Sequence, residues 1–289
     1  MRNLDQHNIT EEVLRRISDT SDRRLHEILT SLVRHLHDFA REVHLSEAEL
    51  FEGIKFLTRT GHLCTGARQE FILLSDTLGL SQLVVAQNHN RPADTTEQTV
   101  FGPFHVEGAP SRPAHGGNIA VELPGDPLFV NAQVWSDGKP VADAVVDVWQ
   151  ADSEGFYDVQ DPNWTLDGAE LRAVFRTDKQ GRISFRSILP KSYPIPTDGT
   201  VGDMLRATER SPMRPAHMHF RVVKKGYDTL ITHVFVQGDE YLDSDAVFGV
   251  RASCIGDYVR HEADEEVNGV AQSSPFYKLD YRFELHPQT

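Results

Sequence analysis

The chain has 289 residues, of which 39% are hydrophobic and 25% are charged, a composition typical of a globular protein with a buried core. Its formal net charge of -14 at pH 7 disfavours nucleic acid and anionic membranes as partners, because both are negatively charged. The only cysteines, Cys64 and Cys254, are far apart in the sequence, which excludes a disulfide framework or a cysteine-rich zinc site as the organising feature.

Neither a membrane span nor a secretory signal is expected. No apolar run reaches the roughly 18 residues that a membrane-spanning helix needs. The first residues, M-R-N-L-D-Q-H-N, lack the apolar segment of a secretory signal. We therefore expect a protein of the reducing cytoplasm.

The first part of the chain, up to about residue 95, predicts helices. It contains no proline before residue 92, and all 15 prolines come from there onward. Apolar residues recur at three- and four-residue spacing, which indicates one stripe along a long helix. These residues are Leu25, Ile28, Leu29, Leu32, Val33, Leu36, Phe39 and Val43. The stripe is interpreted either as packing on neighbouring helices or as a contact between two subunits.

Further helices are expected in the same region. Ser46 and Glu49 form a capping box ahead of a second apolar stripe, and Gly61 can end that helix. Another helix is expected over residues 67–78, with a short one after Ser81. Residues 1–95 are thus predicted to be a helical domain.

From residue 96 onward the period of the pattern changes to two, which predicts β-strands. The strand-like segments are 128–134, 141–149, 173–177, 182–188, 217–223, 230–237 and 277–285. The turn sequences S-D-G-K-P and D-K-Q-G lie between successive segments and predict hairpins. Because no helical pattern intervenes, residues 96–289 are predicted to form a mainly antiparallel β-sandwich, and the whole chain an α+β fold.

Two long segments without a strand pattern, 152–172 and 189–216, separate these strands. Loops of this length in a compact domain are usually functional. They contain Tyr157, in A-D-S-E-G-F-Y-D, and Tyr193, in L-P-K-S-Y-P-I-P. Both tyrosines follow strands that could bring them to one end of the sandwich.

His217 and His219 lie two residues apart in the segment R-P-A-H-M-H-F. Side chains at positions i and i+2 of a strand share a face, so both imidazoles point one way. Met218, Phe220 and Val222 then point to the core. Two adjacent imidazoles are half of a metal site, and on their own they leave iron, copper and zinc open.

Carboxylates of the common metal-site patterns do not complete this site. A cupin-type site has a glutamate four or five residues after the second histidine, where this chain has Val223 and Lys224. A two-histidine, one-carboxylate iron(II) site usually has an acid near the first histidine, where this chain has Met218. Since no cysteine is near either, tyrosine phenolates are the available anions.

Five motifs carry a family resemblance. They are R-Q-E-F-I-L-L-S-D-T-L-G-L-S (68–81), T-V-F-G-P-F-H-V-E (99–107), V-D-V-W-Q-A-D (146–152), Y-P-I-P-T-D-G (193–199) and R-P-A-H-M-H-F (214–220). Together they resemble the intradiol ring-cleaving dioxygenases, the catechol 1,2-dioxygenase superfamily, and within it most closely the branch that cleaves hydroxyquinol. The resemblance covers essentially the whole chain.

The resemblance implies a non-haem iron(III) in each subunit with a solvent hydroxide as its fifth ligand. The protein ligands that it implies are Tyr157, Tyr193, His217 and His219. It assigns Tyr193 as the ligand that leaves when a diol binds. It also implies a homodimer built on the N-terminal helices, with a phospholipid between the subunits in many members.

The implied reaction is cleavage of an aromatic ring by O2 between two hydroxylated carbons. Iron(III) would favour the phenolate form of the tyrosines and hold both diol oxygens. Negative charge that builds on the ring needs a cationic partner, for which Arg214 is the candidate. Family position adds Gln237 as a second partner.

Benzene-1,2,4-triol is the expected substrate, with 3-hydroxy-cis,cis-muconate or maleylacetate as the product in aromatic degradation. Asp76, within an apolar run, is the candidate partner of the third hydroxyl. The wall residues that the resemblance adds are Leu73, Val100, Phe101, Gly102, Pro103, Phe104, Ile195, Pro196 and Val247, together with Arg214. Catechol and chlorocatechol are alternative substrates, and a non-catalytic module that binds metal or an aromatic molecule is the alternative from another class.

Overall fold

The computed structural model of the chain describes residues 3–65, 68–89, 94–267 and 269–288. Two compact units make up the chain, residues 1–59 and residues 60–289. Long helices give way to strands between Asn88 and His115. The predicted domain boundary at residue 95 stays a prediction.

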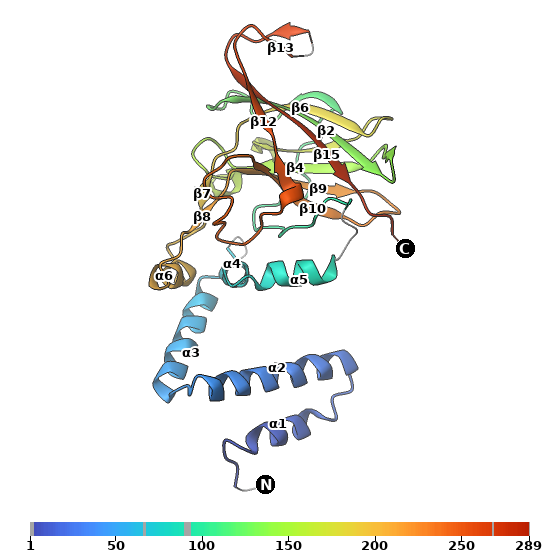
Figure 1. The fold of residues 1–289 in the computed structure, drawn as a ribbon. Coiled ribbons are helices and arrows are strands. Elements are labelled where there is room, and N and C mark those ends of the chain that lie inside the picture. Colours follow the sequence, from blue (N-terminus) through green and yellow to red (C-terminus); the bar gives the residue numbers. More distant parts are fainter. Residues whose placement is uncertain (1–2, 66–67, 90–93, 268, 289) are drawn as a thin grey trace. The chain divides into compact units, whose positions relative to one another are not determined.

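Helices occupy the N-terminal part of the chain (Figure 1). They are α1 (Ile9–Ile17), α2 (Arg23–Glu42), α3 (Glu47–His62), α4 (Glu70–Thr77) and α5 (Leu80–Asn88). The predicted capping box of α3 is confirmed, because the Ser46 amide donates to the Glu49 carboxylate and the Glu49 amide donates to the Ser46 hydroxyl. The helix predicted over 67–78 is found as α4, and Ala67, its expected first residue, lies outside the described residues. Within the described ranges, no helix has both the length and the apolar character that a bilayer crossing requires.

The apolar stripe of α2 remains largely exposed in the single chain. Leu29 and Val33 are half-buried. The other stripe residues have exposed fractions of 45–55%; these are Leu25, Ile28, Leu32, Leu36, Phe39 and Val43. Neighbouring helices of the same chain do not bury these side chains, so the interpretation of the stripe as internal packing is wrong for them.

Two β-sheets form a sandwich in the second unit (Figure 1). One sheet has the order β1 (His115–Asn118), β6 (Arg182–Ile188), β2 (Pro127–Ser136), β15 (Phe276–Glu284) and β12 (Tyr258–His261), with β3 (Lys139–Pro140) paired to β2. The other has the order β11 (Ile255–Gly256), β10 (Leu230–Val236), β9 (His217–Val223), β4 (Val145–Gln150) and β5 (Arg172–Arg176). Most neighbouring pairs are antiparallel, and residues of both sheets, such as Val130 and Phe220, share one buried core. The predicted fold class is confirmed.

One of the predicted hairpins is wrong, and the other is shorter than expected, because β2 pairs with β3 and not with the strand that follows it. The turn S-D-G-K-P leads from β2 to the short strand β3, after which the chain enters β4 of the other sheet. The turn D-K-Q-G likewise leads from β5 in one sheet to β6 in the other. A short turn between alternating strands is compatible with pairing and with crossing to the facing sheet, since one face of each strand is buried in both cases. β9 and β10 do pair, with His219 opposite His233.

The sequence pattern predicted that the two long segments, 152–172 and 189–216, are irregular, but both contain short helices or strands. The first segment contains the 3-10 helices Asp158–Gln160 and Leu166–Gly168, and the second contains β7 (Tyr193–Pro194), α6 (Thr200–Ala207) and β8 (Met213–Arg214). Three further short elements lie nearer the C-terminus: the 3-10 helix Ala252–Cys254, β13 (Glu266–Val267) and β14 (Val270–Ala271). α6 has about two turns and contains Gly202, so its helical pattern in the sequence is weak.

Glu70 joins α4 to α6. Its buried carboxylate accepts hydrogen bonds from the Val201 amide at 3.1 Å and from the Arg68 guanidinium at 2.9 Å. An anion at the first turn of a helix also interacts favourably with the helix dipole. Gly199 leaves room for this contact, because a Cβ there would lie 2.3 Å from the Glu70 carboxylate. The connection holds the segment after Tyr193 against the helix that carries Asp76.

Candidate metal centre

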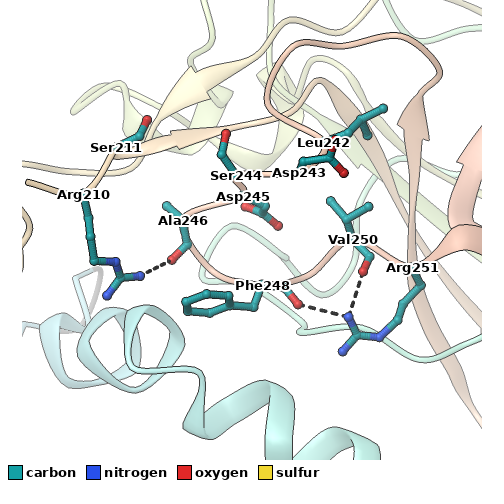
Figure 2. Close-up of a pocket in the computed structure, with 10 residues that line it drawn as sticks. All are labelled: Arg210, Ser211, Leu242, Asp243, Ser244, Asp245, Ala246, Phe248, Val250 and Arg251. Atoms are coloured by element: carbon teal, nitrogen blue, oxygen red, sulfur yellow. Dashed lines mark hydrogen bonds between the residues drawn. The ribbon is translucent and has the colours of Figure 1, made fainter.

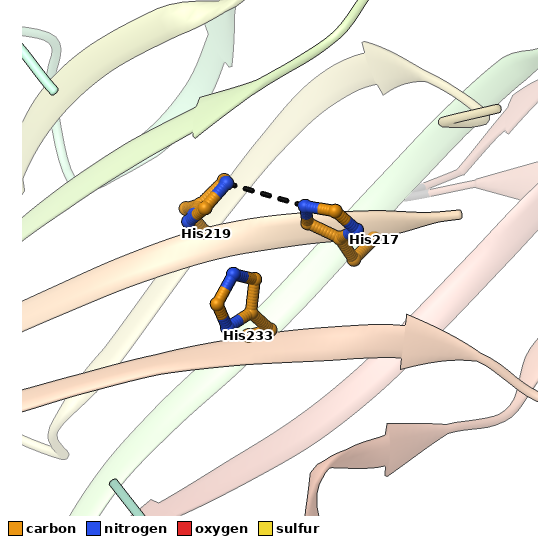
Figure 3. Close-up of side chains that lie close together, drawn as sticks. All are labelled: His217, His219 and His233. Atoms are coloured by element: carbon orange, nitrogen blue, oxygen red, sulfur yellow. Dashed lines mark hydrogen bonds between the residues drawn. The ribbon is translucent and has the colours of Figure 1, made fainter. Parts of the chain in front are cut away.

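His217 and His219 lie on β9 with their imidazoles close together (Figure 3), and they alternate with residues of the core, so their face of the sheet is opposite it. As predicted, Met218, Phe220 and Val222 belong to the core. The two histidines are nevertheless only 1% exposed. Their Nε2 atoms lie 3.2 Å apart, so two potential ligand atoms meet at one point.

Tyr157 and Tyr193 reach the same point from the two long loops. The Tyr157 hydroxyl lies 2.9 Å from His219 Nε2, 3.4 Å from His217 Nε2 and 3.2 Å from the Tyr193 hydroxyl. Tyr157 directly precedes a 3-10 helix, and its amide donates to the Gln160 side chain. Tyr193 lies in β7 and is 6% exposed, whereas Tyr157 is 2% exposed.

The spacing of these four atoms fits a shared cation. Nitrogen and oxygen ligands about 2 Å from a metal ion in a tetrahedral arrangement lie about 3 Å from one another. The four separations given above, from 2.9 to 3.4 Å, match that value. Phenolate oxygens and neutral imidazole nitrogens are both metal-ligand types, so this donor set suits a cation.

Burial keeps both imidazoles in the neutral form that binds metals. The Nδ1–H of His217 donates to the Pro215 carbonyl at 2.7 Å, which leaves the Nε2 lone pair facing the cluster. Burial, together with the charge of Arg214, lowers the pKa of His217 to about 3. Burial, together with His217, lowers the pKa of His219 well below its ordinary value.

Tyr157 has the opposite requirement. Burial raises the pKa of Tyr157 well above its ordinary value, and the neighbouring Tyr193 adds to this effect. The phenol therefore keeps its proton unless a bound cation compensates for the loss of solvent. Its ionisation would therefore be coupled to the binding of a cation.

A third imidazole, His233, adjoins the cluster and was not predicted. It is fully buried on β10, directly opposite His219, and the two ring centroids are 4.2 Å apart (Figure 3). The ligand atoms of His217, His219 and His233 lie within 4.8 Å of one another. The signal in the sequence was available: pairing the two strands around K-K-G-Y-D brings His233 to the face of His219.

Arg214 lies beside the cluster and forms an ion pair with Asp245. Its Nε donates to Asp245 Oδ1 at 3.1 Å, and the two side chains are 5% and 2% exposed. Burial alone would lower the pKa of Arg214, but Asp245, Tyr193 and Tyr157 together outweigh burial, so the pKa stands above its ordinary value. The guanidinium is permanently charged, and its Nη1 lies 3.4 Å from His217 Nε2.

Gln237 lies outside the cluster, contrary to expectation. Its side chain is exposed in the turn after β10, and its backbone amide donates to the Gly256 carbonyl. The residue of β10 that faces the ligand atoms is His233, four positions earlier. Counting along one strand does not show which residue a partner strand places at the site.

The predicted wall residues come from several segments. Phe104 stacks on Tyr157 with ring centroids 4.3 Å apart. Gly102 lies against His219, since a Cβ there would be 3.4 Å from the imidazole Cε1. Of the others, Val100, Ile195 and Val247 are buried, Leu73 and Pro196 are half-buried, and Phe101 and Pro103 are exposed.

Asp76 lies on α4 and is 5% exposed. Burial raises the pKa of Asp76, although Ser81 and the charge of Arg214 oppose the rise. The carboxyl group therefore holds a proton to higher pH than an ordinary aspartate does. A polar group of this kind suits a hydroxyl in an apolar pocket.

A separate cavity of about 410 Å³ adjoins Asp245 (Figure 2). Its lining residues are Arg210, Ser211, Leu242, Asp243, Ser244, Asp245, Ala246, Phe248, Val250 and Arg251. Arg210 donates to the Ala246 carbonyl, and Arg251 donates to the Phe248 carbonyl. Among the described residues that line this cavity there is no candidate ligand and no predicted wall residue. The cavity is therefore distinct from the cluster.

Gly155 is a site residue that the sequence did not reveal. Its φ is +89°, and a Cβ there would lie 2.7 Å from the Cβ of Tyr193. We expect Gly155→Ala to displace Tyr193 and weaken metal retention, in addition to a loss of about 1–2 kcal/mol for the left-handed backbone. Elemental analysis after dialysis against a chelator measures retention, and denaturant unfolding measures stability.

The matched control is Gly138→Ala. Gly138 has a φ of +73° and no atom within 4 Å of an added Cβ. This variant should lose stability and keep its metal. Equal metal retention in the two variants would show that the contact with Tyr193 is unimportant.

Comparison with known proteins gives a consistent result. The family described as "Dioxygenase" matches residues 100–287, and the family described as "Catechol dioxygenase N terminus" matches residues 22–96. The chain is 54% identical over 288 residues to the 6-chlorohydroxyquinol 1,2-dioxygenase of Cupriavidus pinatubonensis, covering 99% of each chain. It is 46% identical over 284 residues to the hydroxyquinol 1,2-dioxygenase of Nocardioides simplex, covering 98% of this chain and 96% of the relative.

Solved structures agree with these relatives. The hydroxyquinol 1,2-dioxygenase of Pseudomonas putida superposes with a TM-score of 0.90 at 45% identity, covering 98% of this chain and 99% of that one. The catechol 1,2-dioxygenase of Pseudomonas arvilla superposes with a TM-score of 0.84 at 26% identity, covering 100% and 93%. The chain therefore belongs to the intradiol ring-cleavage dioxygenases, the family of the catechol and hydroxyquinol 1,2-dioxygenases.

Proposed function

We propose that the chain cleaves benzene-1,2,4-triol (hydroxyquinol) with O2 between its two adjacent hydroxylated carbons. The product is 3-hydroxy-cis,cis-muconate or its tautomer maleylacetate. The observation that carries this proposal is the convergence of two phenols and two neutral imidazoles beside the buried Arg214. The relatives that are named for hydroxyquinol and its 6-chloro derivative support this choice of substrate.

Iron(III) is the proposed cofactor, one ion per subunit, held by Tyr157, Tyr193, His217 and His219. Two anionic phenolates with two neutral nitrogens suit a hard trivalent cation better than they suit zinc or copper(I). When bound, iron(III) supplies a Lewis acid that orients both diol oxygens. The ligand atoms fit such an ion because they already lie 2.9–3.4 Å apart.

Tyr193 is proposed to accept a proton from the arriving diol at its phenolic oxygen. A diol that binds through both oxygens loses two protons, and solvent hydroxide takes the other. Tyr193 suits this role better than Tyr157, because Tyr193 lies in a two-residue strand and is the more exposed of the two. The neutral phenol can then leave the ligand position.

Arg214 is proposed to stabilise the negative charge that develops on the aromatic ring. Its charge is permanent, and Asp245 fixes its Nε, so no reorganisation is needed during the reaction. It transfers no proton, since its pKa lies above the ordinary value. Its contribution is electrostatic.

Asp76 is proposed to bind the third hydroxyl of the triol. It is a buried carboxyl group on an otherwise apolar helix segment, F-I-L-L-S-D-T-L. Catechol or chlorocatechol would offer this group no third hydroxyl to bind, which disfavours both as substrates.

A homodimer through the N-terminal helices is part of the proposal. An apolar surface as extensive as that of α2 and α3 is rarely left open to water by a monomer. A phospholipid between the subunits would cover whatever part the partner leaves exposed. We propose the cytoplasm as the location, and the two free cysteines accord with a reducing compartment.

The Tyr157→Phe variant tests the iron(III) centre. Reconstitution with iron(III) should give the wild type a broad visible band, from charge transfer between tyrosinate and iron, and uptake of about one O2 per triol. Tyr157→Phe should lose the band and the activity, because it lacks the phenolate. Tyr281→Phe is the control, since the Tyr281 hydroxyl donates to the Ser253 carbonyl instead. A wild type that stays colourless rejects iron(III), and a coloured one without O2 uptake favours the non-catalytic module.

Substrate preference is tested by comparing kcat/KM for benzene-1,2,4-triol, catechol and chlorocatechol under one condition. The triol should give the highest value. Asp76→Leu should lower kcat/KM for the triol about 10- to 100-fold, equivalent to about 1.5–3 kcal/mol of lost hydrogen bonding, and change catechol little. The exposed Asp257→Leu serves as control. A wild type that prefers catechol or chlorocatechol contradicts the triol assignment.

Sedimentation equilibrium tests the dimer. The wild type should be a dimer, and Leu36→Glu should shift it towards monomer, because Leu36 is an apolar stripe residue that is 55% exposed in the single chain. His35→Glu adds the same charge at the next residue, off the stripe, and should stay dimeric. Mass spectrometry of an organic extract tests for phospholipid. A monomeric wild type would overturn the dimer.

A further inference from the structure

His233 is fully buried beside the four candidate ligands and is not one of them. Its ring stacks on Phe235 and contacts both His217 and His219, with ring centroids 5.2, 4.7 and 4.2 Å away. It enters the site from β10, the strand paired with β9 (Figure 3). A polar ring in such a position needs partners for both of its nitrogens.

Both ring nitrogens of His233 have a partner in the protein. Nδ1 is hydrogen-bonded to the hydroxyl of Thr99, a residue that is 3% exposed. Nε2 lies 3.5 Å from Nη2 of Arg214. A guanidinium nitrogen can only donate, so Nε2 carries the lone pair and Nδ1 carries the proton, which Thr99 accepts. The contact with Thr99 thereby selects the tautomer that can receive Arg214.

Arg214 is consequently held at two points. Asp245 accepts from its Nε at 3.1 Å, and His233 faces its Nη2. The remaining terminal nitrogen, Nη1, is the one that lies 3.4 Å from His217 Nε2, at the ligand cluster. Two anchors define the plane of a guanidinium, whereas Asp245 alone would leave it free to rotate about one hydrogen bond.

A role for His233 as a metal ligand is disfavoured by the same contacts. Arg214 approaches the Nε2 atoms of both His217 and His233, but among the described residues only His217 Nε2 also lies within hydrogen-bonding distance of a phenol oxygen, 3.4 Å from Tyr157. The Nε2 of His233 faces Arg214, and its Nδ1 is engaged with Thr99. A metal at either nitrogen would have to displace one of these partners. The phenol oxygens and the Nε2 atoms of His217 and His219, by contrast, meet one another at 2.9–3.4 Å.

We propose that His233 is a positioning residue for Arg214. Thr99 holds His233, and His233 fixes the Arg214 guanidinium in the plane that faces the aromatic ring of the substrate. This inference rests on the proposed function, in which Arg214 stabilises charge on the ring. Thr99 immediately precedes the predicted wall residue Val100, so the same contact ties the pocket wall to the arginine.

Three variants of the full-length, iron-loaded protein test this role. Thr99→Val removes the hydroxyl with little change of shape, and His233→Leu removes both hydrogen-bonding nitrogens. His233→Gln restores them in part, because its carbonyl can face Arg214 while its amide donates to Thr99. The control is Thr232→Val, since the Thr232 hydroxyl is equally buried but donates to the Glu97 carbonyl.

The measurements are kcat and KM for benzene-1,2,4-triol, iron content and the visible absorption band. Thr99→Val and His233→Leu should lower kcat about 10- to 100-fold, as is usual for residues that orient a functional group, with iron content and band unchanged. His233→Gln should recover part of the loss, and Thr232→Val should keep the wild-type kcat. Loss of iron or a shifted band in His233→Leu would make His233 a ligand and overturn the proposal.

Two further results would also overturn it. One is a wild-type kcat in His233→Leu, and the other is a kcat in Thr99→Val equal to that of Thr232→Val. If His233→Leu does not fold, the comparison of the two threonine variants decides. O2 uptake by the unaltered protein is measured separately. If the wild type is active and the variants keep its kcat, the positioning role is rejected and the proposed function stands.

Discussion

The charge of Arg214 is the constraint on which the site depends. A guanidinium with a side chain that is only 5% exposed is costly to bury without a partner, and Asp245 supplies the opposite charge. The amides of Val247 and Gly249 in turn donate to Asp245. Gly249 permits this arrangement, because a Cβ there would lie 3.1 Å from the Asp245 carboxylate and 3.2 Å from the Arg214 guanidinium. Backbone amides of the segment after β10 therefore hold the carboxylate of the ion pair in place.

The same charge influences the protonation of its neighbours. After burial, Arg214 contributes to the lowered pKa of His217 and of His219, and it opposes the effect of burial that raises the pKa of Tyr157. Neutral imidazoles and ionised phenols are the forms that a cation binds. One buried guanidinium thus favours the binding form of the nitrogen ligands and eases ionisation of a phenol, before any metal enters.

Local pattern was sufficient to predict the parts of the site that depend on one segment. β9 spans His217–Val223, the predicted 217–223, and the alternation of side chains places both histidines on one face. Prediction failed where two distant segments must be known together. His233 meets the cluster only through cross-strand register, Gly155 matters only because Tyr193 approaches it, and Gln237 was assigned without knowing which residue the partner strand presents. The D-K-Q-G hairpin was predicted wrongly for the same reason, since β5 and β6 lie in different sheets.

β7 and β8 connect two residues that must behave differently during the proposed reaction. Tyr193 is paired with Arg214 in this short antiparallel ribbon, yet the tyrosine has to leave its position and the arginine has to stay. Asp245 and His233 hold Arg214, and the Ile195 amide donates to the Pro212 carbonyl, so the backbone of the ribbon is fixed. In the proposed reaction, release of Tyr193 would then be a rotation of its side chain. Gly155 lacks a Cβ beside Tyr193 Cβ, so the backbone of the other loop can approach the base of this side chain. In the proposed reaction, a fixed backbone with one movable ring would let the ligand set change while the Arg214 guanidinium stays beside the substrate.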